Sequence, residues 1–310
     1  MKYLAFYDIV ENKAENRNIV LAATNKLKYI FECIDALGIK CEIISASATK
    51  NKKTVRHKVL NISDNVTLDL PFSFGNINKI TLALNIILIH IELFFKLMKM
   101  KKNETLVVYH SLYYMRLVAL IKKIKKFRLI LEVEEIYGDV IGKSKVSQNE
   151  LKFFDIADAY IFPTELLNEK VNKSGKPHVF IYGTYRVEED RKCKFDDGKI
   201  HAVYAGTFDP RKGGGFAAAA AGKLDFNYHI HIIGFGTEKD KKSLQDSIVK
   251  LAKTTSCKVT YDGLLSGEEY IRFIQSCHIG LSTQNPDADF NETSFPSKVL
   301  SYMSNGLRVV

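Results

Sequence analysis

Near the end of the chain, Ser-Phe-Pro-Ser-Lys (294–298) precedes an apolar-periodic run that predicts a helix. Pro296 suits the first turn of a helix because its missing N–H would have no partner there. The other free N–H groups and the positive end of the helix dipole attract an anion, and Ser297 and Lys298 add a hydroxyl and a positive charge. The stretch therefore predicts a phosphate site, with a capped surface helix as the alternative.

A second group of candidate phosphate ligands follows a predicted strand. The stretch YAGTFDPRKGG leaves its strand at Gly206 and reaches Arg211 and Lys212 before a glycine run. Glycines permit close backbone approach and the two cations suit a diphosphate, although a solvated basic turn has the same composition. HIIGFG places Gly234 at another strand end, but a lone G-x-G is a weak signal. Neither half begins with G-x-G-x-x-G, which disfavours a nicotinamide-dependent dehydrogenase.

The elements that must position these residues alternate along the chain. Short apolar runs that predict strands alternate with stretches of helical periodicity over residues 1–185 and again over 199–310. A polar, charged segment at 186–198 separates them and is typical of a linker. Such alternation is typical of parallel sheets covered on both faces. We therefore expect an α/β protein of two Rossmann-like, doubly wound domains that face a cleft, with ligands at the carboxyl ends of the strands.

Four stretches of the second half, in this order and spacing, resemble the donor domain of a family 4 glycosyltransferase with the GT-B fold. They are YAGTFDPRKGG, IIGFG, VTYDGLLSGEEY and SFPSKVLSYMSNGLRVV, and the first half agrees in its ENRN loop, VYHS and LEVEEIY. The resemblance covers nearly the whole chain. It implies two Rossmann-like domains, a nucleotide-sugar donor held mainly by the second domain, retention at the anomeric carbon, and no metal or other cofactor.

The resemblance also implies roles for single residues. The implied donor site consists of Gly206, Arg211, Lys212, Gly234, Tyr261, Pro296, Ser297 and Lys298. Among these, Lys212 and, less closely, Arg211 match cations that hold the donor diphosphate. Gly234 and the loop from Tyr261 to Leu265 fall where the family holds the base. His110, at the carboxyl end of the predicted strand TLVVYH, matches a histidine that faces the donor sugar, and we name it with Lys212 as the catalytic candidates. A lone histidine is otherwise more often structural.

Two positions depart from the family's common pattern. The family often carries Glu-x(7)-Glu across the last helix, where this chain has Thr293 and Ser301, with Glu292 one residue early. It also often has an arginine after the glycine of the first donor strand, where this chain has Thr207. We therefore expect a weaker grip on the ribose and less charge at the phosphates. GT-B domains continue past this RVV, so we also expect the C-terminal part to be missing.

Composition narrows the class of protein. At 310 residues, with 46% hydrophobic and 26% charged residues, the chain is typical of a two-domain globular protein. The net charge of +10 indicates a polyanionic partner, and the five cysteines, without C-x-x-C spacing, indicate reduced cytosolic thiols and no zinc site. Charged residues soon follow the first apolar run, so no signal peptide is expected.

The apolar stretch 80–98 approaches the length of a membrane span, but its polar residues favour a helix packed in an α/β domain with one face open to lipid.

Acidic residues supply further candidates. Glu132 and Glu134 lie on one face at the end of a predicted strand, and we expect them, with Arg17 near the first helix, to bind the acceptor. An acidic rim neutralised by nearby cations is an equal alternative. Asp287 and Asp289 spell the D-x-D that binds metal in a different glycosyltransferase fold, but they lie in a polar loop before the phosphate helix. We therefore expect no metal ligand among them.

Two basic segments of the first half suggest a membrane partner. KLMKMKK (96–102) and IKKIKKFR (121–128) mix lysines with large apolar side chains, as membrane-surface helices do. Each cation near an anionic surface contributes about 1 kcal/mol, so we expect reversible binding to the inner face of the cell membrane. Solvated helix faces are the alternative. The sequence contains no recognisable nucleic-acid-binding module, so nucleic acid is not an expected partner.

These predictions combine into one function hypothesis and one alternative. The first is a retaining, metal-independent, cytoplasmic and peripheral membrane glycosyltransferase. It would move a sugar from a nucleotide sugar to a saccharide or lipid-linked saccharide during surface polysaccharide synthesis. The alternative is a catalytically impaired or truncated relative that binds a nucleotide or serves as a partner protein. The departures at Thr293 and Ser301 motivate this alternative.

Overall fold

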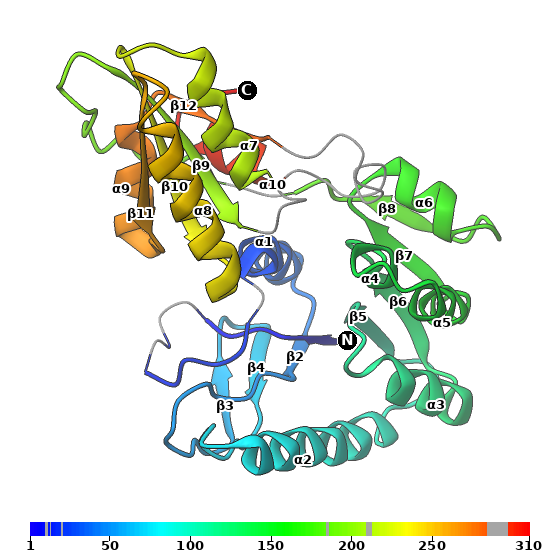
Figure 1. The fold of residues 1–310 in the computed structure, drawn as a ribbon. Coiled ribbons are helices and arrows are strands. Elements are labelled where there is room, and N and C mark those ends of the chain that lie inside the picture. The colour runs from blue at the N-terminus through cyan, green and yellow to red at the C-terminus, as the bar shows by residue number, and fades with distance from the viewer. Residues whose placement is uncertain (10–11, 13, 20, 184–185, 209–212, 284–296) are drawn as a thin grey trace. The chain divides into compact units, whose positions relative to one another are not determined.

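The computed structural model describes residues 1–9, 12, 14–19, 21–183, 186–208, 213–283 and 297–310. The chain divides into two compact units: the first contains the described residues up to 183, and the second those from 186 onward. Each unit is built around its own sheet (Figure 1).

The first unit contains an eight-stranded sheet. Its strands are β1 (Lys2–Ala5), β2 (Cys41–Ser45), β3 (Lys58–Asn61), β4 (Val66–Leu70), β5 (Thr105–Tyr109), β6 (Arg128–Glu132), β7 (Ala159–Phe162) and β8 (His178–Phe180). They follow the order β3-β4-β2-β1-β5-β6-β7-β8. All neighbours are parallel except β3 and β4, which form an antiparallel pair.

Helices cover both faces of this sheet. They are α1 (Leu21–Ala36), α2 (Lys79–Met98), α3 (Met115–Lys125), α4 (Tyr137–Val140), α5 (Ser144–Phe154) and α6 (Glu165–Val171). Successive side chains of a strand point to opposite faces, and β1 shows the result. Tyr3 and Ala5 pack with α1 residues such as Leu27, whereas Leu4 packs with residues of α2, α3 and α5. The near-continuous apolar strands are therefore those of a sheet buried on both sides.

Helix α2 is buried along one side only. Its buried residues recur every four positions: Asn85, Ile89, Leu93 and Leu97. The opposite stripe is exposed to solvent and consists of Ile80, Leu84, Ile87, Ile91 and Phe95. Among the described residues, α2 is the one helix long and apolar enough to cross a membrane, and 22% of its apolar window is buried. Core helices of soluble proteins pass the same test of length and composition, so this finding alone is weak evidence for a span.

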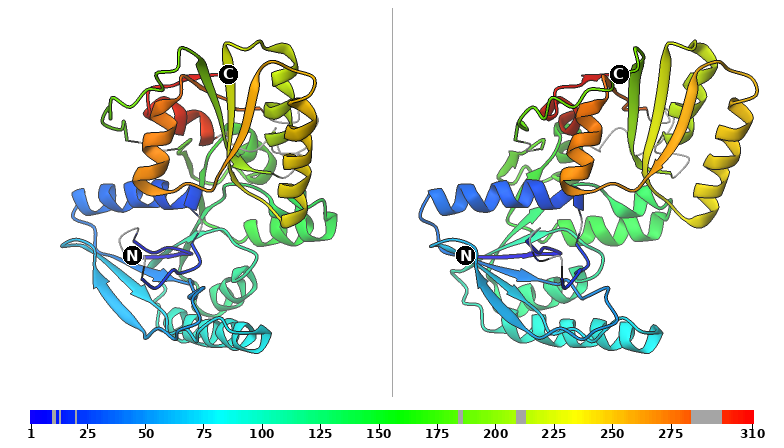
Figure 2. Two further views of the ribbon diagram at one scale, coloured as in Figure 1. Left: turned by 60° about the vertical axis from the view of Figure 1, so that its left-hand side comes forward. Right: turned by 90° about the vertical axis from the view of Figure 1, so that its left-hand side faces the viewer.

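The second unit contains a five-stranded, all-parallel sheet. Its strands are β9 (Ile200–Thr207), β10 (Tyr228–Phe235), β11 (Lys258–Gly263), β12 (Ile279–Gly280) and β13 (Arg308–Val309), in the order β11-β10-β9-β12-β13. Its helices are α7 (Gly214–Ala219), with a 3-10 turn at Ala220–Lys223, α8 (Glu238–Leu251), α9 (Gly267–Ser276) and α10 (Ser297–Ser304). Residues of α7 and α8 pack on one face and residues of α9 and α10 on the other (Figure 2). The expected α/β class with parallel sheets covered on both faces is thereby confirmed.

The segment 186–198 packs against the second unit. The N–H of Glu188 donates to the carbonyl of Ser304 at 2.8 Å, and the N–H of Arg191 donates to Gln275 Oε1 at 2.8 Å. Phe195 joins the apolar cluster beneath α9. The segment predicted as a linker is therefore held against the second unit by hydrogen bonds and by the packing of Phe195.

Candidate functional site

Two predicted donor-site glycines lie side by side at the carboxyl ends of β9 and β10. Gly206 pairs with Gly234 in the register of the two strands. Gly234 has a φ of +134°, and a Cβ there would lie 1.8 Å from the carbonyl oxygen of Gly206. Only glycine fits this position, because any side chain would meet backbone that cannot move aside without separating the strands. The close backbone approach expected from the sequence is thus present.

Lys298 joins these glycines from the first turn of α10. Its Nζ lies 3.2 Å from the hydroxyl of Tyr204 and 4.3 Å from the centre of the same ring. Its Cε lies 2.9 Å from the point where a Cβ on Gly206 would stand. Since Gly206 has no side chain, the lysine can cross the end of β9 and keep its ammonium beside the phenol ring. Ser297, the first residue of α10, is half-buried next to it.

Tyr302 locks α10 to the sheet and so sets the place of Lys298. Its hydroxyl accepts from the N–H of Ala205 at 2.8 Å and donates to the carbonyl of Leu281 at 3.3 Å. A Cβ on Gly280 would lie 2.3 Å from the Tyr302 ring, so this glycine makes room for the tyrosine. Burial raises the pKa of Tyr302, which keeps the hydroxyl protonated and able to donate. Tyr204 and Tyr302 were not among the predicted site residues, because an aromatic residue in a strand or helix is more often part of the core than of a binding site.

Tyr261 lies at the same edge of the sheet, at the end of β11. Its hydroxyl donates to the carbonyl of Gly234 at 3.4 Å, and its ring meets Phe208 edge-on at 5.3 Å. The ammonium of Lys241 lies 5.7 Å from the ring centre. The structure thus brings together the donor-site candidates of the described part of the chain: Gly206, Gly234, Tyr261, Ser297 and Lys298. Three further candidates, Arg211, Lys212 and Pro296, fall outside the described residues, as do Thr293, Asp287 and Asp289.

In the first unit, two acceptor-side candidates share a lysine. Glu132, fully buried at the carboxyl end of β6, accepts a hydrogen bond from the Tyr3 hydroxyl. Lys26 of α1 places its Nζ 3.2 Å from Glu132 Oε1 and also pairs with Glu134. Burial and the charge of Glu132 raise the pKa of Glu134, and Lys26 opposes this shift. Two carboxylates around one ammonium place hydrogen-bond acceptors for a ligand at the end of the strand. The same arrangement also fits the alternative from the sequence, an acidic rim neutralised by a nearby cation.

His110 is buried and held by a carboxylate. Its Nε2 lies 2.7 Å from Glu150 Oε1, and the same carboxylate accepts from the N–H groups of Tyr137 at 2.9 Å and Gly138 at 2.6 Å. Because a carboxylate only accepts, Nε2 carries a proton, while the buried Nδ1 has no hydrogen-bond partner among the described residues. Glu150 belongs to the amphipathic helix α5, and nothing in its sequence context distinguishes it. A role of His110 toward a donor sugar stays a prediction.

Arg17 is buried and ties three loops together. Its Nη1 donates to the carbonyls of Ser47 at 2.8 Å and Pro71 at 2.9 Å, and its Nε donates to Glu15 at 2.6 Å. These carbonyls follow β2 and β4, so the guanidinium holds the carboxyl ends of these strands to the loop after β1. Its Nη2 has no hydrogen-bond partner in the part of the chain that the structure describes. Contact with an acceptor likewise stays a prediction.

A cavity of about 330 Å³ lies elsewhere in the first unit, near Tyr7, Phe31 and Ile62. None of the predicted site residues that the structure describes lines it.

Comparison with known proteins identifies the fold. No protein-family model matches the sequence, and no curated protein matches it. Among solved structures, a trehalose-6-phosphate protein from E. coli bound with UDP-2-fluoro glucose matches with a TM-score of 0.67 at 10% identity, over 98% of this chain and 82% of that one. Sucrose-phosphate synthase from Thermosynechococcus elongatus matches with a TM-score of 0.66 at 12% identity, over 100% and 80%. The Anabaena protein HepE, in complex with UDP and glucose, matches with a TM-score of 0.62 at 11% identity, over 100% and 80%. The chain therefore has the GT-B fold of these structures.

Proposed function

We propose that the protein is a glycosyltransferase that moves a sugar from a nucleotide-sugar donor to a saccharide acceptor. The observation that carries this proposal is the cluster of Gly206, Gly234 and Lys298 at the carboxyl ends of parallel strands in a GT-B fold. Glycines admit a ligand close to the backbone, and a lysine at a helix N-terminus binds phosphate. The bound UDP-2-fluoro glucose and UDP of two structural neighbours support a nucleotide-sugar donor for this chain as well.

In this proposal, the second unit stabilises the departing nucleoside diphosphate. Lys298 and the N–H groups at the start of α10 face the negative charge that develops as the glycosidic bond breaks, and Arg211 and Lys212 add to them. This fixed positive charge takes the place of a divalent ion at the phosphates. With no nucleophile assigned, the acceptor attacks from the side of the leaving group and gives its proton to the leaving phosphate, so the configuration is retained. The resemblance to family 4 supports this mechanism.

The acceptor, we propose further, is a saccharide or lipid-linked saccharide used in surface polysaccharide synthesis at the inner face of the membrane. The exposed apolar stripe of α2 supports this assignment, since its five large side chains lie on one side of the helix. Exposed lysines stand at both ends of α2, at Lys79 and at Lys99, Lys101 and Lys102. An apolar stripe between cations is the pattern of a helix that lies on an anionic bilayer.

The donor assignment is tested with the whole chain and a matched pair of lysine variants. Lys298→Ala should weaken binding of UDP or GDP, measured by calorimetry, by about 10- to 100-fold, as expected for a lost charge-assisted contact. Lys250→Ala removes the same charge from an exposed position of α8 and should bind as wild type does. Sugar transfer or donor hydrolysis should fall in the first variant alone. Equal binding by all three proteins would remove the phosphate role of Lys298.

A nucleotide-binding protein without transferase activity is the second candidate. One contact favours it: Ser301, which stands where the family often has a ribose-binding glutamate, places its hydroxyl 3.0 Å from the Tyr270 hydroxyl. Such a protein would bind UDP or GDP and show neither transfer nor donor hydrolysis. Turnover of any nucleotide sugar would decide for the enzyme. Because the proposal needs no metal at the phosphates, turnover should not require added Mg²⁺ or Mn²⁺.

A further inference from the structure

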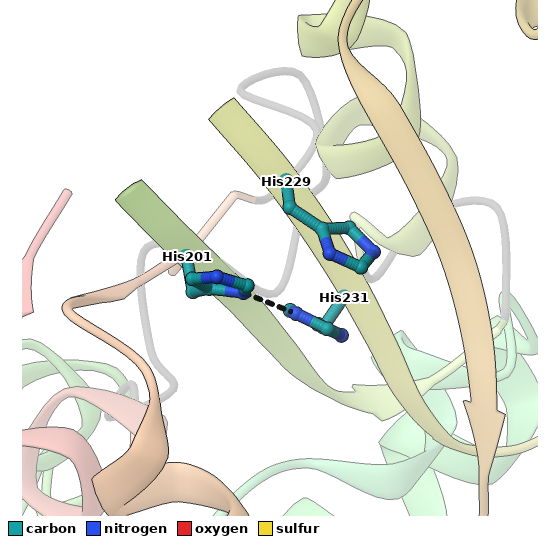
Figure 3. Close-up of side chains that lie close together, drawn as sticks. All are labelled: His201, His229 and His231. Carbon is teal, nitrogen blue, oxygen red and sulfur yellow. Dashed lines mark hydrogen bonds between the residues drawn. The ribbon is translucent and has the colours of Figure 1, made fainter. Parts of the chain in front are cut away.

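Three buried histidines gather at the amino ends of β9 and β10, away from the donor-site glycines. His201 is the second residue of β9, and His229 and His231 lie two residues apart on β10, so their side chains share one face (Figure 3). One ring nitrogen of each lies within 4.8 Å of the corresponding nitrogens of the other two. Phe195 stacks on two of the rings, at 4.1 Å from His201 and 5.2 Å from His231 between ring centres. The cluster therefore has an apolar cover.

Carboxylates hold the outer nitrogens of two of these rings. His201 Nε2 lies 2.8 Å from Asp197 Oδ1, and His231 Nδ1 lies 3.0 Å from Asp262 Oδ2. A carboxylate only accepts hydrogen bonds, so both outer nitrogens carry protons. The inner nitrogens, His201 Nδ1 and His231 Nε2, are then unprotonated in neutral rings, yet they lie 2.8 Å apart (Figure 3). Two lone pairs that face each other repel, so this contact requires either a proton shared by the two rings or a metal ion between them.

The third ring has its outer nitrogen held in the same way. His229 Nε2 lies 3.0 Å from the hydroxyl of Thr260, and that hydroxyl donates to Asp262 at 2.8 Å. Because the hydroxyl proton is used on Asp262, Thr260 accepts the Nε2–H of His229, whose Nδ1 is left without a proton.

We propose that His201, His229 and His231 bind a divalent transition-metal ion, with zinc as the first choice. Imidazole nitrogens suit zinc, and three histidines with an open fourth position form a known ligand set. The far nitrogen of each ligand histidine has a partner, a carboxylate for His201 and His231 and a hydroxyl for His229, and such partners fix the tautomer and the orientation that a metal needs. The charges also balance, since Asp197 and Asp262 offset the two positive charges of the ion. With Zn–N bonds of about 2.0–2.1 Å in a tetrahedral site, the inner nitrogens would open from 2.8 Å to roughly 3.3 Å.

This site is separate from the proposed donor site and does not depend on the proposed function. Gly206 lies five positions after His201 in β9, which is roughly 16 Å along a strand. An ion here would join β9 to β10 directly, and Thr260 and Asp262 extend the link to β11. Its expected effect is to stabilise the second unit. The alternative to a metal ion is a proton shared by His201 and His231, and a zinc titration separates these two possibilities.

The test uses the full chain, stripped with EDTA and dialysed, and zinc chloride alone as the probe. Titration against a chromophoric chelator should find one zinc ion per chain, and the thermal unfolding midpoint should rise with zinc. Co²⁺ in its place should give the strong visible absorption of a tetrahedral site. His229→Gln should weaken zinc binding by about tenfold or more, as the loss of one of three ligands requires.

His57→Gln is the matched control. His57, Asp69 and Glu92 form the other group of possible ligands that the described residues contain, and His57 is exposed in the first unit. This variant should bind zinc as wild type does. The proposal is overturned if zinc neither binds at one ion per chain nor raises the unfolding midpoint, which is the result for a shared proton. It is also overturned if His57→Gln loses the ion while His229→Gln keeps it. Should His229→Gln fail to fold, the Co²⁺ spectrum of the wild-type protein still decides.

Discussion

Replacing Gly206 with alanine should weaken donor binding and leave the second unit folded. The new Cβ would stand 2.9 Å from Lys298 Cε and 3.0 Å from the Tyr204 hydroxyl. Carbon atoms in contact prefer about 3.5–4.0 Å, so the lysine chain must move by roughly 0.8 Å. Gly206 is not among the residues with positive φ, and the Lys298 side chain is flexible whereas Tyr204 is buried, so the lysine moves and β9 itself can stay in place. The ammonium then leaves its position 4.3 Å above the Tyr204 ring.

The size of the effect follows from what Lys298 contributes. A hydrogen bond to a charged group contributes about 1.5–3 kcal/mol, and losing most of it corresponds to roughly 10- to 100-fold in affinity. Calorimetric titration with UDP and GDP measures this loss, and thermal unfolding checks that the variant is folded. Gly215→Ala, in α7 of the same unit, is the control, because its Cβ meets no atom within 4 Å. If Gly206→Ala and Gly215→Ala bind the nucleotides equally tightly, the position of Lys298 beside Gly206 does not contribute to phosphate binding.

Gly234→Ala should destabilise the second unit by about 3–5 kcal/mol, because strain at a φ of +134° adds to the clash of the new Cβ with the carbonyl oxygen of Gly206 at 1.8 Å. A urea midpoint equal to that of the wild type would contradict this. Burial raises the pKa of Glu134 from 4.5 to about 7, so the folded state keeps a proton that the unfolded state has lost. The free energy of unfolding should therefore fall as the pH rises from about 4.5 to about 7, and Glu134→Gln should remove part of this fall. If the urea midpoint changes by the same amount between pH 5 and pH 8 in the wild type and in the variant, the assignment is refuted. Ile91→Glu, in the exposed stripe of α2, should reduce flotation with anionic liposomes, whereas Val59→Glu at an exposed position of β3 should not. Equal flotation of the two variants would exclude α2 as the lipid-binding surface.

The alternation of strands and helices was predictable because each strand of a buried parallel sheet is apolar along its whole length. TLVVY and IHAVYAGT are such runs, and they became β5 and β9. The doubly wound arrangement follows from the same pattern, since both faces of such strands need a cover. Parallel strands also bring their carboxyl ends to one edge of the sheet, which is why Gly206, Gly234 and Lys298 could be placed together before the fold was known.

The exposed side of α2 could not be predicted in the same way. The sequence predicted a packed helix with one face open to lipid, but large apolar residues occur on every side of it, so the pattern did not say which face is open. The structure buries the side that carries Asn85, because this side chain accepts from the N–H of Phe74 at 2.7 Å and donates to its carbonyl at 2.9 Å. A polar residue in an apolar run therefore marks the protein-facing side, while Ile87 and Ile91 face outward.

By itself, the sequence determined the class of fold, the strand ends that carry glycine, and the position of a lysine at the start of a late helix. The tertiary structure alone decided which distant side chains meet: Lys26 with Glu132, His110 with Glu150, and His201 with His231. The spacing of His229 and His231 was visible as H-x-H in a strand, but the third ring came from the register of β9 against β10. Strand register and the rotation of each helix about its axis are set by the packing of the whole core, and a local pattern contains neither.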